Sequence, residues 1–293
     1  MKPNFFIIGA PNSGTTSLWY LLRQHPSIYL PDIKEPRFFS SKDFKNNLET
    51  YEDLFKEAKQ EHAVGEASVN YSETHIWPKV PRRIANYNSQ AKIIYMVRHP
   101  LERIESCWKQ ALSSGHWKKR FYTDKKMPLD FNQAVREYPH MLGTTKYWKH
   151  LSAYRDYFSD KQIKLLFFSD FIENPSVQLE TCCEFLGVDG TFIFENADTP
   201  RNATANKKME RPLIVKIKQL KIIEMVKKVL PDAWKSYLDK NFLSKPVPCE
   251  VDWNGETKKW VLIQLKGDIQ KILKYGNKPT NYWKFNYDLQ SLS

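Results

Sequence analysis

The chain has 293 residues, of which 41% are hydrophobic and 27% charged, which is typical of a globular protein with a sizeable core. Lysine and arginine outnumber aspartate and glutamate by 45 to 33, a net charge of +12, which fits an anionic small ligand, nucleic acid or a membrane surface. The four cysteines lack metal-ligand spacing, and no apolar stretch reaches membrane-spanning length. These features argue against a disulfide-stapled scaffold and an integral membrane protein. We expect a cytoplasmic protein with reduced thiols.

The first predicted element is a buried strand at Phe5–Gly9, followed by a tight loop and a helix over Thr15–Gln24. Gly9 and Gly14 flank four residues, the spacing of a loop that cradles phosphate at a helix N-terminus. In nucleotide triphosphatases the second glycine is followed by lysine and then serine or threonine, but here two threonines follow. The loop therefore predicts phosphate binding without ordinary ATP or GTP chemistry. A plain helix N-cap is the alternative.

Further along the chain, helices are predicted over Tyr51–Ala58 and Glu73–Asn86, on either side of a short strand at Ala63–Gly65. Glu66 follows this strand directly. A glutamate in this position can act as a general base, or it can cap an element or pair with a basic neighbour such as Arg37. The residues alone leave these roles open.

The next predicted strand, Lys92–Val97, ends at Arg98. A nucleotide triphosphatase usually has an aspartate near the end of such a strand to hold Mg²⁺. An arginine cannot bind a cation, but its guanidinium can bind a phosphate through two hydrogen bonds. Ser106 lies eight residues later in a helix predicted over Leu101–Ser113, and its hydroxyl can support the same phosphate. The sequence therefore predicts two anion sites and no metal site.

The remaining predicted elements continue the alternation of strands and helices. They are helices at Leu129–Glu137, Tyr147–Phe158 and Val177–Leu186 and a strand at Ile163–Phe168. Alternation predicts an α/β fold of three layers, in which helices flank a central, mainly parallel sheet. Ligands bind such sheets at the carboxyl ends of the strands, where the predicted site residues lie. We expect a single domain over 1–293, with a nucleotide-binding α/β core over 1–190 and a more helical part over 191–293.

Several segments together resemble the sulfotransferase family. They are Pro11–Leu18, Ile33–Ser40, Val64–Tyr71, Arg98–Pro100 with Ser106, Tyr147–Phe158, Glu184–Gly187 and Asp268–Trp283. The first resembles the loop that binds the 5′-phosphosulfate of PAPS (3′-phosphoadenosine 5′-phosphosulfate), and the arginine and serine resemble the 3′-phosphate site. Ile33–Ser40 is similar to the KEPxFFS segment of bacterial members. The likeness is continuous to about residue 190 and implies a P-loop-like fold.

The resemblance implies that PAPS is the donor and that no metal takes part. The residues that it places around the 5′-phosphosulfate are Pro11, Asn12, Ser13, Gly14, Thr15, Thr16 and Ser17. Arg98 and Ser106 are implied to hold the 3′-phosphate. Lys207 and Arg211 lie in the segment Pro200–Pro212, whose counterpart in relatives closes over the nucleotide.

One departure from the family concerns the cation at the transferred group. Many relatives have a lysine where this chain has Asn12, and that lysine stabilises the sulfate. A lost donor at such a site typically costs ~3–4 kcal/mol of transition-state stabilisation. We expect Lys34 to supply the missing charge, with Arg37 as the second candidate.

The general base is the other catalytic role that the resemblance assigns. In heparan-type relatives the glutamate of the matching motif takes the proton of the acceptor, which implies Glu66 here. His99 and His75 are the rival bases. His99 lies in the 3′-phosphate motif, and His75 lies on a predicted helix, so both have structural explanations.

Three functions fit these residues to different degrees. The first is an enzyme that transfers a sulfuryl group from PAPS to a hydroxyl, or less readily an amine, of a carbohydrate, lipid or small metabolite. The alternatives are a P-loop kinase of small molecules, which needs Mg²⁺ and a loop lysine, and a non-catalytic binder of anionic polymers, which the charge of +12 suggests. Two ordered anion loops favour the enzyme, with no nucleic-acid partner and at most peripheral membrane contact.

Overall fold

A computed structural model of the chain describes residues 1–114, 127–199, 208–210, 244–246, 248 and 250–285. The chain divides into two compact units. The first, called here the sheet unit, comprises 1–103, 140–201 and 258–293, and the second comprises 104–139 and 202–257. Lys207 and Arg211 lie outside the described residues. The expected single domain, with its parts 1–190 and 191–293, stays a prediction.

The sheet unit is built on a five-stranded sheet whose neighbouring strands are all parallel. Its strands are β1 (Phe5–Gly9), β2 (Ile28–Tyr29), β3 (Ala63–Ala67), β4 (Lys92–Val97) and β5 (Ile163–Phe167). The order is β2-β3-β1-β4-β5, so β1 is central; after β1 the chain forms the edge strand β2, returns to β3 beside β1, and then adds β4 and β5 on the other side. This confirms the predicted α/β fold with a parallel sheet. The missed strand, β2, has two residues, too few for a hydrophobic pattern to reveal.

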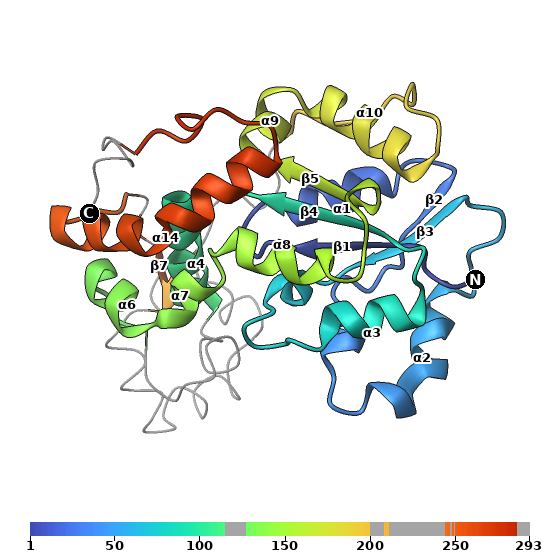
Figure 1. Ribbon diagram of the computed structural model, residues 1–293, viewed down its shortest axis with the longest axis horizontal. Coiled ribbons are helices and arrows are strands. Elements are labelled where there is room, and N and C mark those ends of the chain that lie inside the picture. The colour runs from blue at the N-terminus through green and yellow to red at the C-terminus, as the bar shows by residue number, and fades with distance from the viewer. Residues whose placement is uncertain (115–126, 200–207, 211–243, 247, 249, 286–293) are drawn as a thin grey trace, which may run out of the picture. The chain divides into compact units, whose positions relative to one another are not determined.

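Helices cover both faces of this sheet (Figure 1). Those of the sheet unit are α1 (Thr15–Leu22), α2 (Leu48–Glu52), α3 (Val80–Tyr87), α8 (Tyr147–Arg155), α9 (Phe168–Glu173) and α10 (Pro175–Leu186). Short 3₁₀-helices lie between them at Phe38–Ser40, Phe44–Asn47, Asp53–Phe55, Val69–Ser72 and Asp160–Gln162. α3 begins later than predicted because Pro78 disfavours helix in the preceding residue, whereas Pro81 fits the first turn.

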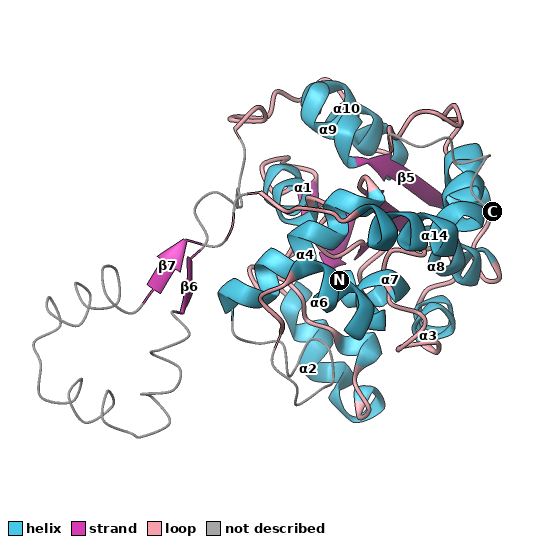
Figure 2. Ribbon diagram, turned by 90° about the vertical axis from the view of Figure 1, so that its left-hand side faces the viewer, coloured by secondary structure: helices cyan, strands magenta, loops and turns pink. Residues whose placement is uncertain are grey.

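Three helices cross or touch the boundaries between the units. They are α4 (Pro100–Ser114), α7 (Pro139–Gly143) and α14 (Gly255–Tyr275). Within the second unit, α6 (Phe131–Glu137) is capped by Asp130, whose side chain accepts a bond from the Gln133 N–H. β6 (Lys208–Glu210) and β7 (Ser244–Pro246) pair in an antiparallel fashion there (Figure 2).

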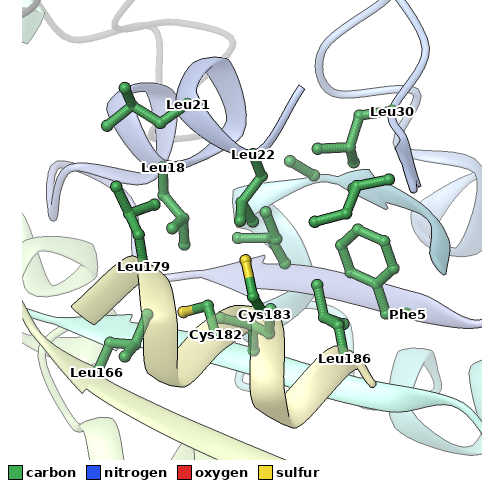
Figure 3. Close-up of a cluster of buried hydrophobic side chains, with 14 of the residues drawn as sticks. Phe5, Leu18, Leu21, Leu22, Leu30, Leu166, Leu179, Cys182, Cys183 and Leu186 are labelled. Carbon is green, nitrogen blue, oxygen red and sulfur yellow. The ribbon is translucent and has the colours of Figure 1, made fainter. Parts of the chain in front are cut away.

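One face of the sheet packs against α1 and α10 through a cluster of buried apolar side chains. Leu18 and Leu22 of α1 meet Leu179 and Leu186 of α10 over Phe5 of the central strand (Figure 3). Cys182 and Cys183 are free and buried in the same cluster, and burial raises the pKa of their thiols to about 12 and about 11. Neither thiol is therefore a nucleophile at neutral pH. We call this the leucine face.

The opposite face is equally buried but rich in aromatic hydroxyl groups. Phe6 of β1 packs edge-on against Phe39 at 5.7 Å. Phe39 in turn contacts the rings of Tyr51, Tyr71 and Tyr87 at 5.4–5.8 Å. This is called the tyrosine face below. It carries Glu66, because successive side chains of β3 alternate between the two faces and its neighbours Ala63 and Ala67 belong to the leucine face.

Candidate active site

The loop over residues 10–14, between β1 and α1, is called the phosphate loop below. It begins beside the end of β4. The Ala10 N–H donates to the Met96 carbonyl at 2.6 Å. Two residues of the loop, Asn12 (φ 65°) and Gly14 (φ 88°), have left-handed backbone conformations. The N–H groups of Ser17 and Leu18 donate to the Gly14 carbonyl, so α1 starts directly after the glycine. The free N–H groups of its first turn and its dipole are suited to an anion.

Gly14 is required at this position for two reasons. Its φ is unfavourable for other residues, and a Cβ atom there would lie 2.5 Å from the Phe168 ring and 3.2 Å from the Met96 sulfur. Phe168 also stacks under Arg98, whose guanidinium carbon lies 4.9 Å from the ring centroid. The loop after β1 and Arg98 after β4 therefore contact the same aromatic ring, which brings the first predicted anion site close to Arg98 of the second.

The predicted loop residues differ in how far they can offer side chains to a ligand. Pro11, Ser13 and Thr15 are buried, whereas Asn12, Gly14, Thr16 and Ser17 are partly exposed. The hydroxyl groups of Thr16 and Ser17 are thus open to contact. For the buried Ser13 and Thr15, the backbone N–H groups are the parts suited to an anion, whereas Pro11 has no N–H to donate.

Arg98 is held by its neighbours through both its backbone and its side chain. The Tyr147 hydroxyl donates to its carbonyl at 2.9 Å, and its Nε donates to Glu102 at 3.0 Å. The Arg98 side chain is 24% exposed and that of Glu102 is 51% exposed, and ion pairs as exposed as this are weak. A phosphate can therefore replace the carboxylate. Ser106 lies on α4 in the second unit and is 8% exposed, so no contact between it and Arg98 is assigned.

Glu66 lies on β3 with 0% of its surface exposed. Three hydroxyl groups donate to its carboxylate: Tyr51 at 3.0 Å and Tyr71 at 2.7 Å to Oε1, and Ser68 at 2.6 Å to Oε2. Burial raises the pKa of Glu66 to about 7, although the three hydroxyl groups oppose the rise. The expected alternative partner, Arg37, pairs with Glu35 instead. Glu66 is therefore a carboxyl group that exchanges a proton near neutral pH.

The segment Lys34–Arg37 lies beside the end of β3. The Glu35 N–H donates to the Ala67 carbonyl at 3.0 Å, and the Arg37 N–H donates to the Ser68 hydroxyl at 3.0 Å. The Lys34 side chain is 16% exposed, and burial lowers the pKa of its ammonium. Since Ser68 N–H also bonds to the Ile7 carbonyl of β1, this segment, Glu66 and the phosphate loop meet at the same edge of the sheet.

The chain is similar to known proteins of one family. A family model described as "Sulfotransferase domain" matches residues 2–245. The chain belongs to the sulfotransferase family. It is 27% identical over 188 residues to heparan sulfate glucosamine 3-O-sulfotransferase 5 of Homo sapiens, covering 64% of this chain and 54% of that protein. It is 26% identical over 220 residues to bifunctional heparan sulfate N-deacetylase/N-sulfotransferase 4 of Mus musculus, covering 67% and 24%.

A solved structure shows the same fold. It is a sulfotransferase from Alicyclobacillus acidocaldarius, with a TM-score of 0.62, 24% identity and coverage of 97% of this chain and 99% of that one. The chain spans about half or less of the length of the curated relatives named above. The family predicted from the sequence motifs is thus confirmed, and the sheet belongs to the P-loop-like fold of sulfotransferases.

The two histidines considered as rival bases have other contacts in this sulfotransferase. His99 lies 3.1 Å from the Lys284 carbonyl and packs against Phe285, and burial lowers its pKa. His75 stacks near His140 and His150, and burial lowers its pKa to about 4. Both histidines are therefore engaged in structural contacts.

Some residues of the candidate site were missed by the sequence reasoning. Tyr51, Tyr71 and Ser68 surround Glu66 from two separate segments, and only the serine was part of a quoted motif. Glu35 is an acidic residue between the basic residues Lys34 and Arg37, and this charge pattern is a sequence signal that could have been used.

In the described part of the chain, no group of His, Cys, Asp and Glu could hold a metal, and no helix is long and apolar enough for a bilayer. Metal independence and a cytoplasmic location stay predictions.

Proposed function

We propose that the chain transfers a sulfuryl group from PAPS to a hydroxyl group, or secondarily an amine, of a carbohydrate, lipid or small metabolite. The observation that carries the proposal is the shared contact of Gly14 and Arg98 with Phe168. It brings a helix N-terminus suited to one phosphate close to a guanidinium suited to another. An adenine nucleotide with phosphate groups at both its 5′ and 3′ positions matches such a pair, whereas AMP fills only half of it.

The residues present fit PAPS without a divalent ion. The first turn of α1, with Thr16 and Ser17, would hold the 5′-phosphosulfate, and Arg98 would exchange Glu102 for the 3′-phosphate. A sulfuryl group carries less charge than a transferred phosphoryl group, so one cation with backbone N–H groups is enough to stabilise it. Lys34 would supply that cation in place of the family lysine that Asn12 replaces. PAPS supplies the activated sulfuryl group.

The reaction requires one proton transfer and one displacement. The acceptor oxygen forms a bond to sulfur as the bond from sulfur to the 5′-phosphate oxygen breaks, which releases adenosine 3′,5′-bisphosphate. Glu66 would receive the acceptor proton, and a base with a pKa near the working pH is well matched to this task. Because the Ser68 hydroxyl donates to Oε2 of Glu66, this hydroxyl must either rotate away or relay the acceptor proton to the carboxylate.

The kinase alternative lacks support at two positions. The phosphate loop has Thr15 where a kinase of this type has lysine, and β4 ends at an arginine where Mg²⁺ chemistry calls for a carboxylate. The names of the matched relatives favour a carbohydrate among the possible acceptors. The charge of +12 also suits an anionic glycan.

The proposal is tested first through nucleotide binding. Adenosine 3′,5′-bisphosphate at 100 times its Kd should raise the free energy of unfolding by ~2.7 kcal/mol, and AMP at the same concentration should raise it far less. Two variants at one ion pair have opposite expected effects. R98A should weaken binding of the bisphosphate, and E102Q should strengthen it by removing a competitor for the guanidinium. Equal thermal shifts with the two nucleotides would contradict the proposal.

The acceptor is then sought by turnover. PAPS labelled with ³⁵S is incubated with glucosamine-containing polysaccharides, simple sugars, lipids and phenols, with and without EDTA. Transfer that persists in EDTA supports the proposed reaction. Transfer of ³²P from ATP that stops in EDTA would support the kinase instead.

A further inference from the structure

Arg103 of α4 is a buried arginine whose partners are all uncharged. It belongs to the sheet unit, and 0% of its surface is exposed. Its Nε donates to the Thr145 hydroxyl at 2.9 Å, and its Nη2 donates to the Met141 carbonyl at 2.5 Å. Among the described residues, Nη1 has no hydrogen-bond partner. Burying a charge without an acidic partner costs several kcal/mol, so this arginine calls for an explanation.

The two acceptors of Arg103 lie on the segment that leads from α7 to α8. The Thr145 hydroxyl itself donates to the Met141 carbonyl at 2.7 Å, so guanidinium, hydroxyl and carbonyl form a closed ring of three hydrogen bonds. The Thr145 carbonyl accepts a bond from the Tyr147 N–H at 2.9 Å, and Tyr147 is the first residue of α8. Arg103 therefore fixes the backbone immediately before Tyr147.

The Tyr147 hydroxyl lies between the two predicted anion sites. The side chain is fully buried, and its hydroxyl donates to the Arg98 carbonyl at 2.9 Å. Burial raises the pKa of Tyr147 to about 12, whereas the charge of Arg103 and the neighbouring Ser13 side chain oppose the rise. Ser13 belongs to the phosphate loop, and within the described ranges its hydroxyl forms no hydrogen bond of normal geometry. One buried hydroxyl thus contacts Arg98 and lies beside the phosphate loop.

Fastening α4 to the segment before α8 does not by itself require an arginine. Apolar side chains of similar volume often replace buried ionic groups with no loss of stability. If Arg103 were absent, Thr145 and Met141 would still bond to each other. What an arginine adds is a rigid, planar group that donates to two acceptors at once. The cost of burying it is explained if the exact position of Tyr147 matters.

We propose that Arg103 is a positioning residue of the donor site. It holds Tyr147 so that the Tyr147 hydroxyl keeps Arg98 and the phosphate loop at the separation that the two phosphate groups of the donor require. This rests on the proposed function, because the loop and Arg98 are taken to bind those groups. A nucleotide with both phosphate groups depends on this separation, whereas a nucleotide with one phosphate group does not.

The first experiment measures the nucleotide affinities of R103M by calorimetry. The Kd of adenosine 3′,5′-bisphosphate should rise about tenfold, less than the ~100-fold loss that a misplacement of 1 Å can cause. The Kd values of AMP and of adenosine 3′-monophosphate should stay within twofold. KM for PAPS should rise with the Kd of the bisphosphate, and kcat should stay within twofold. A purely structural arginine would change all three Kd values alike or leave all three unchanged, and either result would overturn the proposal.

A matched pair of milder variants serves in case R103M does not fold. T145V removes the hydroxyl that accepts from Arg103 and keeps the shape of the side chain. T144V is the control, because Thr144 is equally buried and its hydroxyl donates to Glu73 at 3.2 Å. The Kd of the bisphosphate should rise about threefold in T145V, a smaller effect than that of R103M because Nη2 keeps its acceptor, and it should be unchanged in T144V. Equal Kd values in the two variants would contradict the proposal.

A double-mutant cycle asks whether Arg103 acts through Tyr147. Y147F should raise the Kd of the bisphosphate about tenfold, and R103M should have no further effect in the Y147F background. Effects that multiply would mean that Arg103 acts by another route, and the assignment would be wrong.

The parent chain separates this inference from the proposed function. If the parent chain binds the bisphosphate no better than AMP, both are overturned. If the parent chain and R103M prefer the bisphosphate equally, the proposed function stands and the inference about Arg103 fails.

Discussion

The leucine face and the tyrosine face of the sheet are both buried, but they differ in what their side chains can do. On the leucine face, Leu22 and Leu179 pack in the apolar core, and the groups proposed to bind the donor at the end of this face are backbone N–H groups. On the tyrosine face, hydroxyl groups surround Glu66, whose side chain is the proposed base. Changes on the first face should alter stability, whereas changes on the second should alter activity and pH dependence.

The largest expected effect is the loss of the base on the tyrosine face. E66Q should lower kcat by ~10²- to 10⁴-fold, the usual contribution of general base catalysis. The amide keeps hydrogen-bonding capacity toward Tyr51, Tyr71 and Ser68, so the fold should be retained. Steady-state turnover gives the loss, and the thermal shift with adenosine 3′,5′-bisphosphate serves as the folding control. Normal turnover in a folded E66Q would remove Glu66 from the mechanism.

The next effect belongs to the leucine face. L22A deletes a side chain that is fully buried between α1 and the sheet, and such deletions typically cost ~2–5 kcal/mol. The free energy of unfolding should fall by that amount in urea titrations. The control I172A, at an exposed position on α9, should change it by less than ~0.5 kcal/mol. A similar cost at both positions would mean that α1 does not pack as described.

The third effect is a pH dependence of the free energy of unfolding that comes from the tyrosine face and not from the leucine face. Because the pKa of Glu66 is raised from 4.5 to about 7 in the folded chain, its proton stabilises the fold. This contribution is fully present below pH 4.5 and is lost as the pH rises through about 7. Between pH 5 and pH 8 it amounts to about 2–3 kcal/mol.

The measurement is the free energy of unfolding of the parent chain, E66Q and L22A at pH 5 and pH 8. The parent chain and L22A should share the same loss on going to pH 8, and in E66Q that loss should be smaller by about 2–3 kcal/mol. An identical pH dependence in all three proteins would show that Glu66 titrates normally.

The same two faces explain which features could be predicted from the sequence. The bounds of β1 and β4 were predicted to the residue, because short apolar runs bounded by glycine or arginine are local signals. The loop between β1 and α1 and the place of Arg98 after β4 were predicted for the same reason, and their roles in binding stay predictions. The hydroxyl groups of Tyr51 and Tyr71 contact Glu66 only after separate segments of the chain pack together, so no local sequence pattern predicts these contacts. Burial of Ser13 and Thr15 likewise depends on packing against the rest of the unit.

The smallest predicted effect concerns a distant support of the Arg98 site. Asp268 of α14 accepts bonds from the Trp148 and Lys149 N–H groups at 3.0 and 2.9 Å, so it caps the start of α8. The first residue of that helix, Tyr147, donates to the Arg98 carbonyl. D268A should therefore cost ~1 kcal/mol of stability, as the loss of a helix cap does, and D268N should cost less because an amide oxygen can still accept a bond.

D160A is the matched control for this cap, since Asp160 pairs with Arg155 and accepts a bond from the Tyr275 hydroxyl of α14. These contacts lie at the surface, where ion pairs contribute little. D268A and D160A should both leave the Kd of AMP unchanged, because AMP lacks the 3′-phosphate that Arg98 is proposed to bind. The Kd of adenosine 3′,5′-bisphosphate should rise by about twofold in D268A alone, because Arg98 loses part of its support. A rise of the same size in D160A would contradict the proposed link from Asp268 of α14 through Tyr147 of α8 to Arg98.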